Sequence, residues 1–235
     1  MKIPKPKHWM DSHIFFKFQI VEHFMRDAST GISLAREKRE EFFEEQLGKY
    51  PQEAQDIIEM HESDVQKYKV VYLNMLLTSS FSSSYFVFEA LCTELCRLAM
   101  ERVKLKLSYK DVQKSPNVME TVKIYFNKGI GINLSHLSGE WDKLDEFRKI
   151  RNSIVHQQSN ILTNNSASIE KQDLYHIVMK YKSIKLNKKT GYFYLKDDEI
   201  VLEFMSVAKK YLRGVLKEIL KLKQKRRTRK INQAI

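Results

Sequence analysis

The segment at residues 148–156, "RKIRNSIVH", gathers three side chains that can act together on a phosphate: Arg151, Asn152 and His156. An arginine presents a planar fork of donors that matches phosphate oxygens. A histidine moves protons near neutral pH, and an asparagine amide can orient either neighbour. These residue types predict chemistry at a phosphate, with Arg148 one helical turn earlier as a further substrate contact.

The helical pattern places Arg151 beside an apolar stripe. At 100° per residue, Phe147, Ile150 and Ile154 fall in one sector of roughly 60°. An unpaired buried charge costs several kcal/mol, so this guanidinium must be balanced. Two arrangements would balance it: it pairs with an internal carboxylate such as Glu89, or it faces a substrate.

The string "RNSIVH" resembles the signature of the HEPN superfamily, in which Arg, often followed by Asn, precedes a His by a few residues. Arg151, Asn152 and His156 match the informative positions. The preceding "WDKLDEFRKI" and the earlier "SSSYFVFEALCTELCRLAMERV" are similar to bundle helices of that family. The resemblance covers roughly residues 60–180 and implies an all-α, HEPN-like helical bundle.

The resemblance also implies an activity, that of a metal-independent endoribonuclease without cofactors. By this likeness His156 serves in proton transfer, Arg151 stabilises charge on the phosphate, and Asn152 orients them. It further implies a homodimer with a composite active site, a role as toxin or phage-defence effector, and a possible antitoxin or regulatory protein. The alternative is a non-catalytic module of the same fold that binds RNA or protein.

The charge of the chain indicates a polyanionic partner, RNA before membrane. The formal net charge is +12, and residues 217–230 hold eight Lys or Arg and one Glu. Arg226 and Arg227 in this tail are therefore predicted substrate contacts. Two alternatives stay open for the tail: it is a solvated helix end, or it is the main nucleic-acid contact and the motif is incidental.

Scarce Gly (7) and Pro (4) favour long helices. We expect a helical extension at residues 1–50, the bundle at 51–180, and a β-hairpin with a basic helix at 181–235, packed on the same domain. In the extension, a helix at 9–28 is followed by a second one that Ser33 caps. The residues expected to face inward on the first helix are Trp9, Ile14, Phe15, Phe18, Val21 and Phe24.

Further along, Pro51 suits the first turn of a helix, and no strong breaker follows before Val103. We expect either one very long helix or two helices with a bend near the serine-rich run at 79–84. In residues 183–195, "SIKLNKKTGYFYL", Ile184 and Leu186 alternate with polar neighbours, and Tyr192 and Tyr194 do the same across "NKKTG". This pattern predicts a β-hairpin before the last helix. The lysines at its tip, Lys188 and Lys189, are candidate phosphate contacts.

Other features indicate a cytoplasmic protein. Polar residues interrupt every apolar run that could cross a membrane, and the first residues do not fit a secretion signal. Cys92 and Cys96 lie one helical turn apart and are expected to pack as thiols. The histidines show no metal-binding spacing, so no metal site is predicted.

Overall fold

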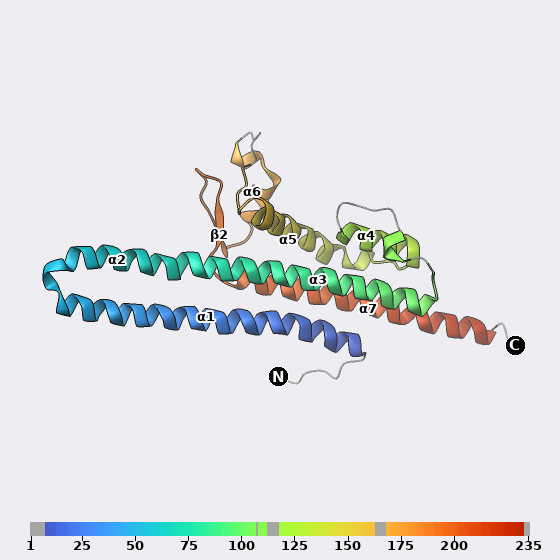
Figure 1. Ribbon diagram of the computed structural model, residues 1–235. Helices are drawn as coiled ribbons and strands as arrows, with labels where there is room; N and C mark the ends of the chain where they lie inside the picture. The colour runs from blue at the N-terminus through green and yellow to red at the C-terminus, as the bar shows by residue number, and fades with distance from the viewer. Residues whose placement is uncertain (1–7, 107, 112–117, 163–167, 233–235) are drawn as a thin grey trace. The chain divides into compact units, whose positions relative to one another are not determined.

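The computed structural model describes residues 8–106, 108–111, 118–162 and 168–232, with the side chains of the last helix described as far as Leu222 (Figure 1). The protein is mostly helical, 81% by residue, and a small antiparallel hairpin precedes the last helix. This confirms the predicted helical class and the hairpin. The helices and strands are α1 (Trp9–Lys49), α2 (Ala54–Gln66), α3 (Leu73–Val103), α4 (Val118–Ile124), α5 (Ser138–His156), α6 (Asp173–Val178), β1 (Ile184–Leu186), β2 (Phe193–Leu195) and α7 (Glu199–Asn232).

Helix α1 runs unbroken through Ser33, so the predicted helix end near residue 28 and the cap at Ser33 are wrong. The segment that follows is rich in good helix formers and carries oppositely charged neighbours four residues apart. One such pair joins Lys49 to Glu45 at 2.5 Å. These local interactions stabilise the helix, so Ser33 remains inside it as an ordinary exposed residue.

The buried stripe of α1 is narrower than predicted. Ile14 and Phe18 are buried, but Trp9, Phe15 and Phe24 are exposed. The residues that are buried follow one another at steps of four and seven: Met10, Ile14, Phe18 and Met25. This spacing is that of a single helical stripe, and the aromatic residues predicted to face inward lie on its flanks.

The interruption between α2 and α3 lies before the serine run. Residues 67–72 form one π-helical segment, and α3 continues through residues 79–84 without a break. Ser80 and Ser84 are buried within α3. The alternative with a bend at the serines is therefore wrong, and the helical path runs from Pro51 to Val103 without a non-helical residue, as the other alternative predicts. Pro51 at a helical first turn and the helix end at Val103 are confirmed.

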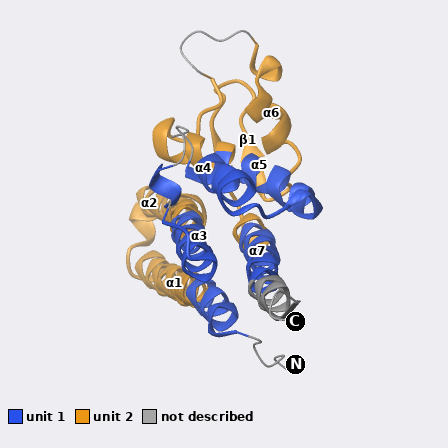
Figure 2. Cartoon of the chain, turned by 90° about the vertical axis from the view of Figure 1, so that its right-hand side faces the viewer, with its two compact units in different colours: residues 1–19, 84–148, 204–235 blue, residues 20–83, 149–203 orange. Residues whose placement is uncertain are grey.

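The chain divides into two compact units, coloured in Figure 2. The first unit comprises residues 1–19, 84–148 and 204–235, and the second comprises residues 20–83 and 149–203. The predicted boundaries at residues 50 and 180 stay a prediction.

Aromatic side chains form the centre of the first unit. Phe204 of α7 lies 5.5 Å, between ring centroids, from both Tyr85 of α3 and Phe147 of α5. Tyr211, further along α7, lies 6.2 Å from Phe88 and 5.8 Å from Trp141. These contacts bring α3, α5 and α7 of this unit together around one core.

The hairpin belongs to the second unit. Ile184 pairs with Leu195, and Leu186 pairs with Phe193. Ile184, Phe193 and Leu195 are buried, whereas Lys185 between them is exposed. One face of the hairpin is therefore covered and the other is open. The predicted alternation of Tyr192 and Tyr194 is wrong by one residue, because Phe193 and Leu195 pair with the apolar residues of β1 and share their covered face.

Candidate functional site

The three motif residues lie at the end of α5, on the part of the helix that belongs to the second unit. Arg151 and Asn152 are half-buried, and His156, the last helical residue, is exposed. Arg151 donates from Nη1 to Oδ1 of Asn152 at 3.2 Å. The asparagine thus accepts a hydrogen bond from the guanidinium through its oxygen, and its amide nitrogen is a donor group.

Ser153 fixes this end of α5 from the buried side. Its hydroxyl donates to the carbonyl oxygen of Asn160 at 2.9 Å, and its own carbonyl accepts from the backbone N–H of Ser159 at 3.0 Å. Gln158 and Ser159 adopt left-handed backbone conformations, with φ of 52° and 60°. The helix therefore stops directly after His156, and the chain turns back beside Ser153.

The turn after His156 is joined to the hairpin by backbone hydrogen bonds. Ile161 donates to the carbonyl of Gly191, and Phe193 donates to the carbonyl of Ser159, both at 2.9 Å. Gly191 has a φ of 76°, and a Cβ there would lie 2.7 Å from Oδ1 of Asn160. Only glycine fits this close approach, so the hairpin and the end of α5 are fastened to each other.

The two lysines at the hairpin tip are exposed. Lys188 places its Nζ 5.9 Å from the ring centroid of Tyr175, and the backbone N–H of Lys189 donates to the side chain of Asn187. Both ammonium groups are accessible to an anion from solvent. Their segment is the one that the backbone bonds tie to the turn after His156.

The remaining predicted substrate contacts are placed differently. Arg148 belongs to the first unit, and its guanidinium binds Oδ1 of Asp145 through both Nε and Nη2 at 2.8 Å. Its charge is thus already balanced by a carboxylate one turn earlier. Arg226 and Arg227 lie in the last turns of α7, where the side chains are outside the described residues.

The cysteines are packing residues. Cys92 and Cys96 are free thiols buried in α3. Burial raises the pKa of Cys96 to about 12 and that of Cys92 well above its ordinary value, so both are protonated at neutral pH. Within the described residues, no group of three His, Cys, Asp or Glu side chains is arranged to hold a metal ion.

The sequence patterns gave no sign of a cavity of about 490 Å³ in the first unit. Its lining includes Lys123, whose Nζ lies 4.5 Å from the ring centroid of Trp141, together with Asn133, Ser135 and Tyr211. These residues come from α4 and its π-helical extension, the loop at 131–135, α5 and α7. The glycines at 129–131 predict the helix end there, but nothing in the local pattern indicates which later helix closes the space.

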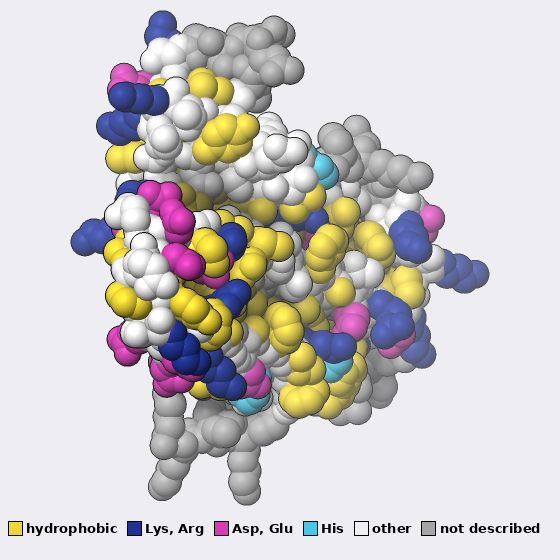
Figure 3. Space-filling view, turned by 60° about the vertical axis from the view of Figure 1, so that its left-hand side comes forward, with side chains coloured by type: hydrophobic (Ala, Val, Ile, Leu, Met, Phe, Trp, Pro, Cys, Tyr) yellow, Lys and Arg dark blue, Asp and Glu magenta, His cyan; other side chains and the backbone are white. Residues whose placement is uncertain are grey.

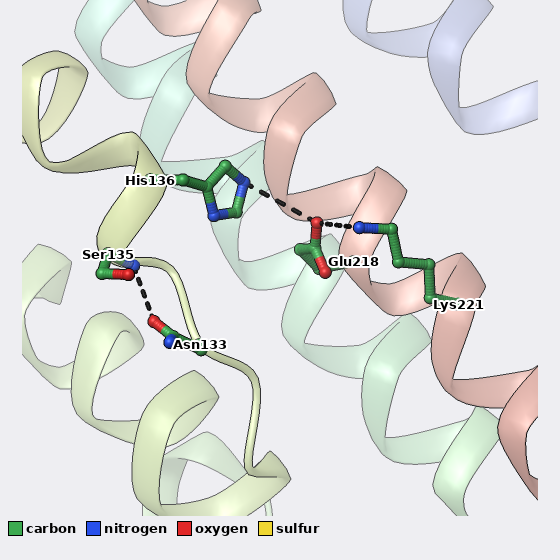
Figure 4. A network of polar contacts seen from close by, with 5 residues as sticks. All are labelled: Asn133, Ser135, His136, Glu218 and Lys221. Atoms are coloured by element: carbon green, nitrogen blue, oxygen red, sulfur yellow. Dashed lines mark hydrogen bonds and ion pairs between the residues drawn. The ribbon is translucent and has the colours of Figure 1, made fainter.

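Polar contacts beside this cavity fasten the loop before α5 (Figure 4). Asn133 accepts from the backbone N–H of Ser135 at 2.9 Å. His136 approaches Glu218 of α7 to 3.7 Å, and Glu218 also accepts from Lys221 at 2.6 Å. These contacts place His136, just before α5, beside Glu218 of α7.

No protein-family model, no curated protein and no solved structure matches this chain. Within the described residues, every helix is too short or too polar to cross a bilayer.

Proposed function

We propose that this protein is a metal-independent endoribonuclease of the HEPN type that acts as a homodimer. The observation that carries the proposal is the arrangement at the end of α5. Arg151 and Asn152 are bonded to each other at 3.2 Å in a half-buried position, and an exposed histidine follows one turn later. This places an oriented guanidinium and an accessible imidazole on the same end of one rigid element.

The chemistry requires one proton acceptor and one proton donor. The 2′-hydroxyl of a ribose attacks the adjacent phosphorus, a base takes its proton, and the bond to the 5′-oxygen of the next nucleotide breaks as an acid protonates that oxygen. The products are a 2′,3′-cyclic phosphate and a free 5′-hydroxyl. His156 acts in proton transfer, and Arg151 stabilises the charge that develops on the phosphate oxygens.

The proposed dimer follows from the need for two proton-transfer groups at one site. The motif supplies one histidine per chain, whereas cleavage needs an acid and a base at once. Two copies facing one groove supply both, together with two guanidinium groups for the phosphate. The exposed lysines of the hairpin, Lys188 and Lys189, then add positive charge for the RNA strand.

The direct test is RNA cleavage by purified protein in excess chelator. Cleavage is expected to persist, to leave 2′,3′-cyclic ends, and to fall by at least about 100-fold in His156→Ala. His176→Ala is the matched control, since His176 is also exposed in the second unit but lies on α6. Cleavage that needs a metal, or that survives His156→Ala, would contradict the proposal.

The toxin or defence role is tested in cells. Expression of the wild-type chain is expected to arrest growth, and His156→Ala is expected to relieve the arrest at equal protein level. Growth unaffected by the wild-type chain at a level that cleaves RNA in extracts would remove the toxin role and leave the enzymatic one.

A second candidate function is a non-catalytic module that binds RNA or protein. The observation that favours it is the long pair formed by α1 and α2, which leaves large apolar side chains exposed. For this function Arg151→Ala weakens RNA binding, and no cleavage product appears under any condition. Gel-shift and cleavage assays on the same variants separate the two candidates.

A further inference from the structure

The end of the α1–α2 pair lacks a hydrophobic core. None of residues 26–75, all of them described, is buried. Within this stretch the tip, defined as residues 37–66, exposes 47% of Phe42 and 71% of Met60, with Tyr50 and Ile58 also exposed. Two helices alone cannot enclose their apolar side chains, so a surface of this kind marks an interaction site.

Few side-chain contacts join the two helices of the tip. The rings of Phe43 and His61 stack with centroids 3.8 Å apart, and Nε of Arg39 lies 3.3 Å from Oδ2 of Asp64. Beside these contacts is a groove of about 290 Å³. Its apolar lining includes Phe42, Phe43, Tyr50, Ile57 and Met60.

The tip as a whole is strongly acidic. The tip contains ten acidic and three basic residues, a net charge of −7 in a chain whose net charge is +12. Helix α2 has no Lys or Arg, and its residues Asp56, Glu59 and Glu62 are exposed. Figure 3 shows hydrophobic side chains lying among charged ones on the face it presents. The tip thus has the charge to bind a basic helix.

The chain carries a segment of that chemistry. Residues 223–230, "KQKRRTRK", hold six Lys or Arg and no acidic residue, and the backbone of α7 is helical through them. The preceding turns of α7 are occupied within the first unit, where Val215 and Ile219 are buried and Glu218 is paired. Residues 223–230 follow these turns and carry the charge that is opposite to that of the tip.

We infer that the acidic tip of one copy binds the basic segment 223–230 of a second copy. The segment continues the helical backbone of α7, so it offers the acidic surface of another copy a basic helix of about two turns. The net charges of −7 and +6 nearly cancel on contact. The association depends on charge, so it weakens as salt shortens the range of these interactions.

Two variants separate this contact from any other dimer interface. The tip variant carries Glu59→Lys and Glu62→Lys, and the tail variant carries Lys225→Gln, Arg226→Gln and Arg227→Gln. Tagged tip variant has an intact tail, so it is expected to capture untagged tail variant, whose tip is intact. It is not expected to capture untagged tip variant through this contact.

A dimer formed through α5 contributes equally to both pairings, so the difference between them reports the tip and tail alone. We expect about fivefold more capture in the first pairing at about 50 mM salt, and no difference at about 500 mM. The matched control carries Glu101→Lys and Glu170→Lys, which reverse the charge of two exposed carboxylates outside the tip. It is expected to keep full capture.

Equal capture in the two pairings, or a control that loses as much as the tip variant, would overturn the inference. The contact does not rest on the ribonuclease proposal. Its failure leaves cleavage by His156 untouched, and a protein without cleavage can still show the capture difference.

Discussion

Two regions of the second unit are built in opposite ways. The end of α5 is anchored by the buried Ser153, and the turn after it is joined to the hairpin by backbone hydrogen bonds of 2.9 Å and by the close approach of Gly191 to Asn160. The tip at residues 37–66 has no buried residue and is held by one ring stack and a few exposed ion pairs. The first region fixes side chains in space, and the second presents a surface.

The difference matches what each region is proposed to do. A site that transfers protons needs donors and acceptors held by a packed surrounding, whereas a docking surface can order when its partner arrives. Helix length does not explain the contrast. Helix α1 is longer than α5, yet part of it belongs to the open tip. The contrast can be broken or sharpened by matched substitutions in the two regions.

The largest contrast is expected from removing one ring in each region. Phe193→Ala deletes a buried ring of β2 and is expected to cost about 3–5 kcal/mol of local stability. Phe43→Ala deletes a half-buried ring of the tip and is expected to cost about 1 kcal/mol, because only the stack with His61 and partial burial are lost. Hydrogen exchange at the amide of Ile161 measures the local stability of the hairpin region. Exchange at the amide of residue 43 measures the local stability of the tip. Equal costs would contradict the contrast.

Glycine substitutions are expected to act with opposite signs. Gly191→Ala places a methyl group 2.7 Å from Oδ1 of Asn160 at a φ of 76° and is expected to destabilise the hairpin by about 2–3 kcal/mol. Gly31→Ala adds a methyl group where nothing lies within 4 Å and is expected to stabilise α1 by about 0.5–1 kcal/mol. Denaturant unfolding of both variants provides the comparison. A neutral Gly191→Ala would show that the hairpin can shift away from the turn.

The sequence was informative wherever a local signal decided the structure. The hairpin at 183–195, the helical turn opened by Pro51 and the end of α3 at Val103 follow from turn residues and alternation. The predicted cap at Ser33 was wrong, because a residue that suits an N-cap does not interrupt a helix when the residues on both sides favour helix. The predicted inward-facing residues of α1 were wrong in part, because their burial depends on the elements that pack against the helix.

The candidate site was likewise predicted only in its local part. Arg151 and Asn152 are neighbours in sequence, and their hydrogen bond is local. The bond from Ile161 to Gly191 joins residues 30 positions apart, and no short pattern encodes that pairing. The same holds for the cavity beside Trp141, whose wall includes Tyr211 from the last helix.

A smaller effect is expected from the serines of the two regions. Ser153→Ala removes the hydroxyl that donates to the carbonyl oxygen of Asn160. The half-buried carbonyl loses this hydrogen bond, which is expected to lower the free energy of unfolding by about 1–2 kcal/mol. Ser63→Ala, on the exposed surface of α2, is expected to change stability by less than about 0.5 kcal/mol. If His156 depends on this anchored helix end, Ser153→Ala also lowers cleavage, whereas Ser63→Ala does not. Cleavage unchanged by a clearly destabilising Ser153→Ala would separate the anchor from the chemistry.

The smallest effect concerns the ion pair between α1 and α2. Arg39→Gln removes the 3.3 Å contact with Asp64, both side chains being partly exposed, and is expected to cost about 0.5 kcal/mol at low salt. A hydrogen bond from Lys67, and then the charges of Lys67 and Arg39, lower the pKa of Asp64. A carboxyl with a lowered pKa stabilises the folded state above its unfolded pKa, near 3.8, and that contribution disappears as the pH falls through the folded value. The cost of Arg39→Gln should therefore be present at neutral pH, shrink with added salt and vanish in strong acid. A cost that persists at high salt would mean that the alkyl stem of Arg39 packs in the groove, and the tip would then be less open than its lack of buried residues indicates.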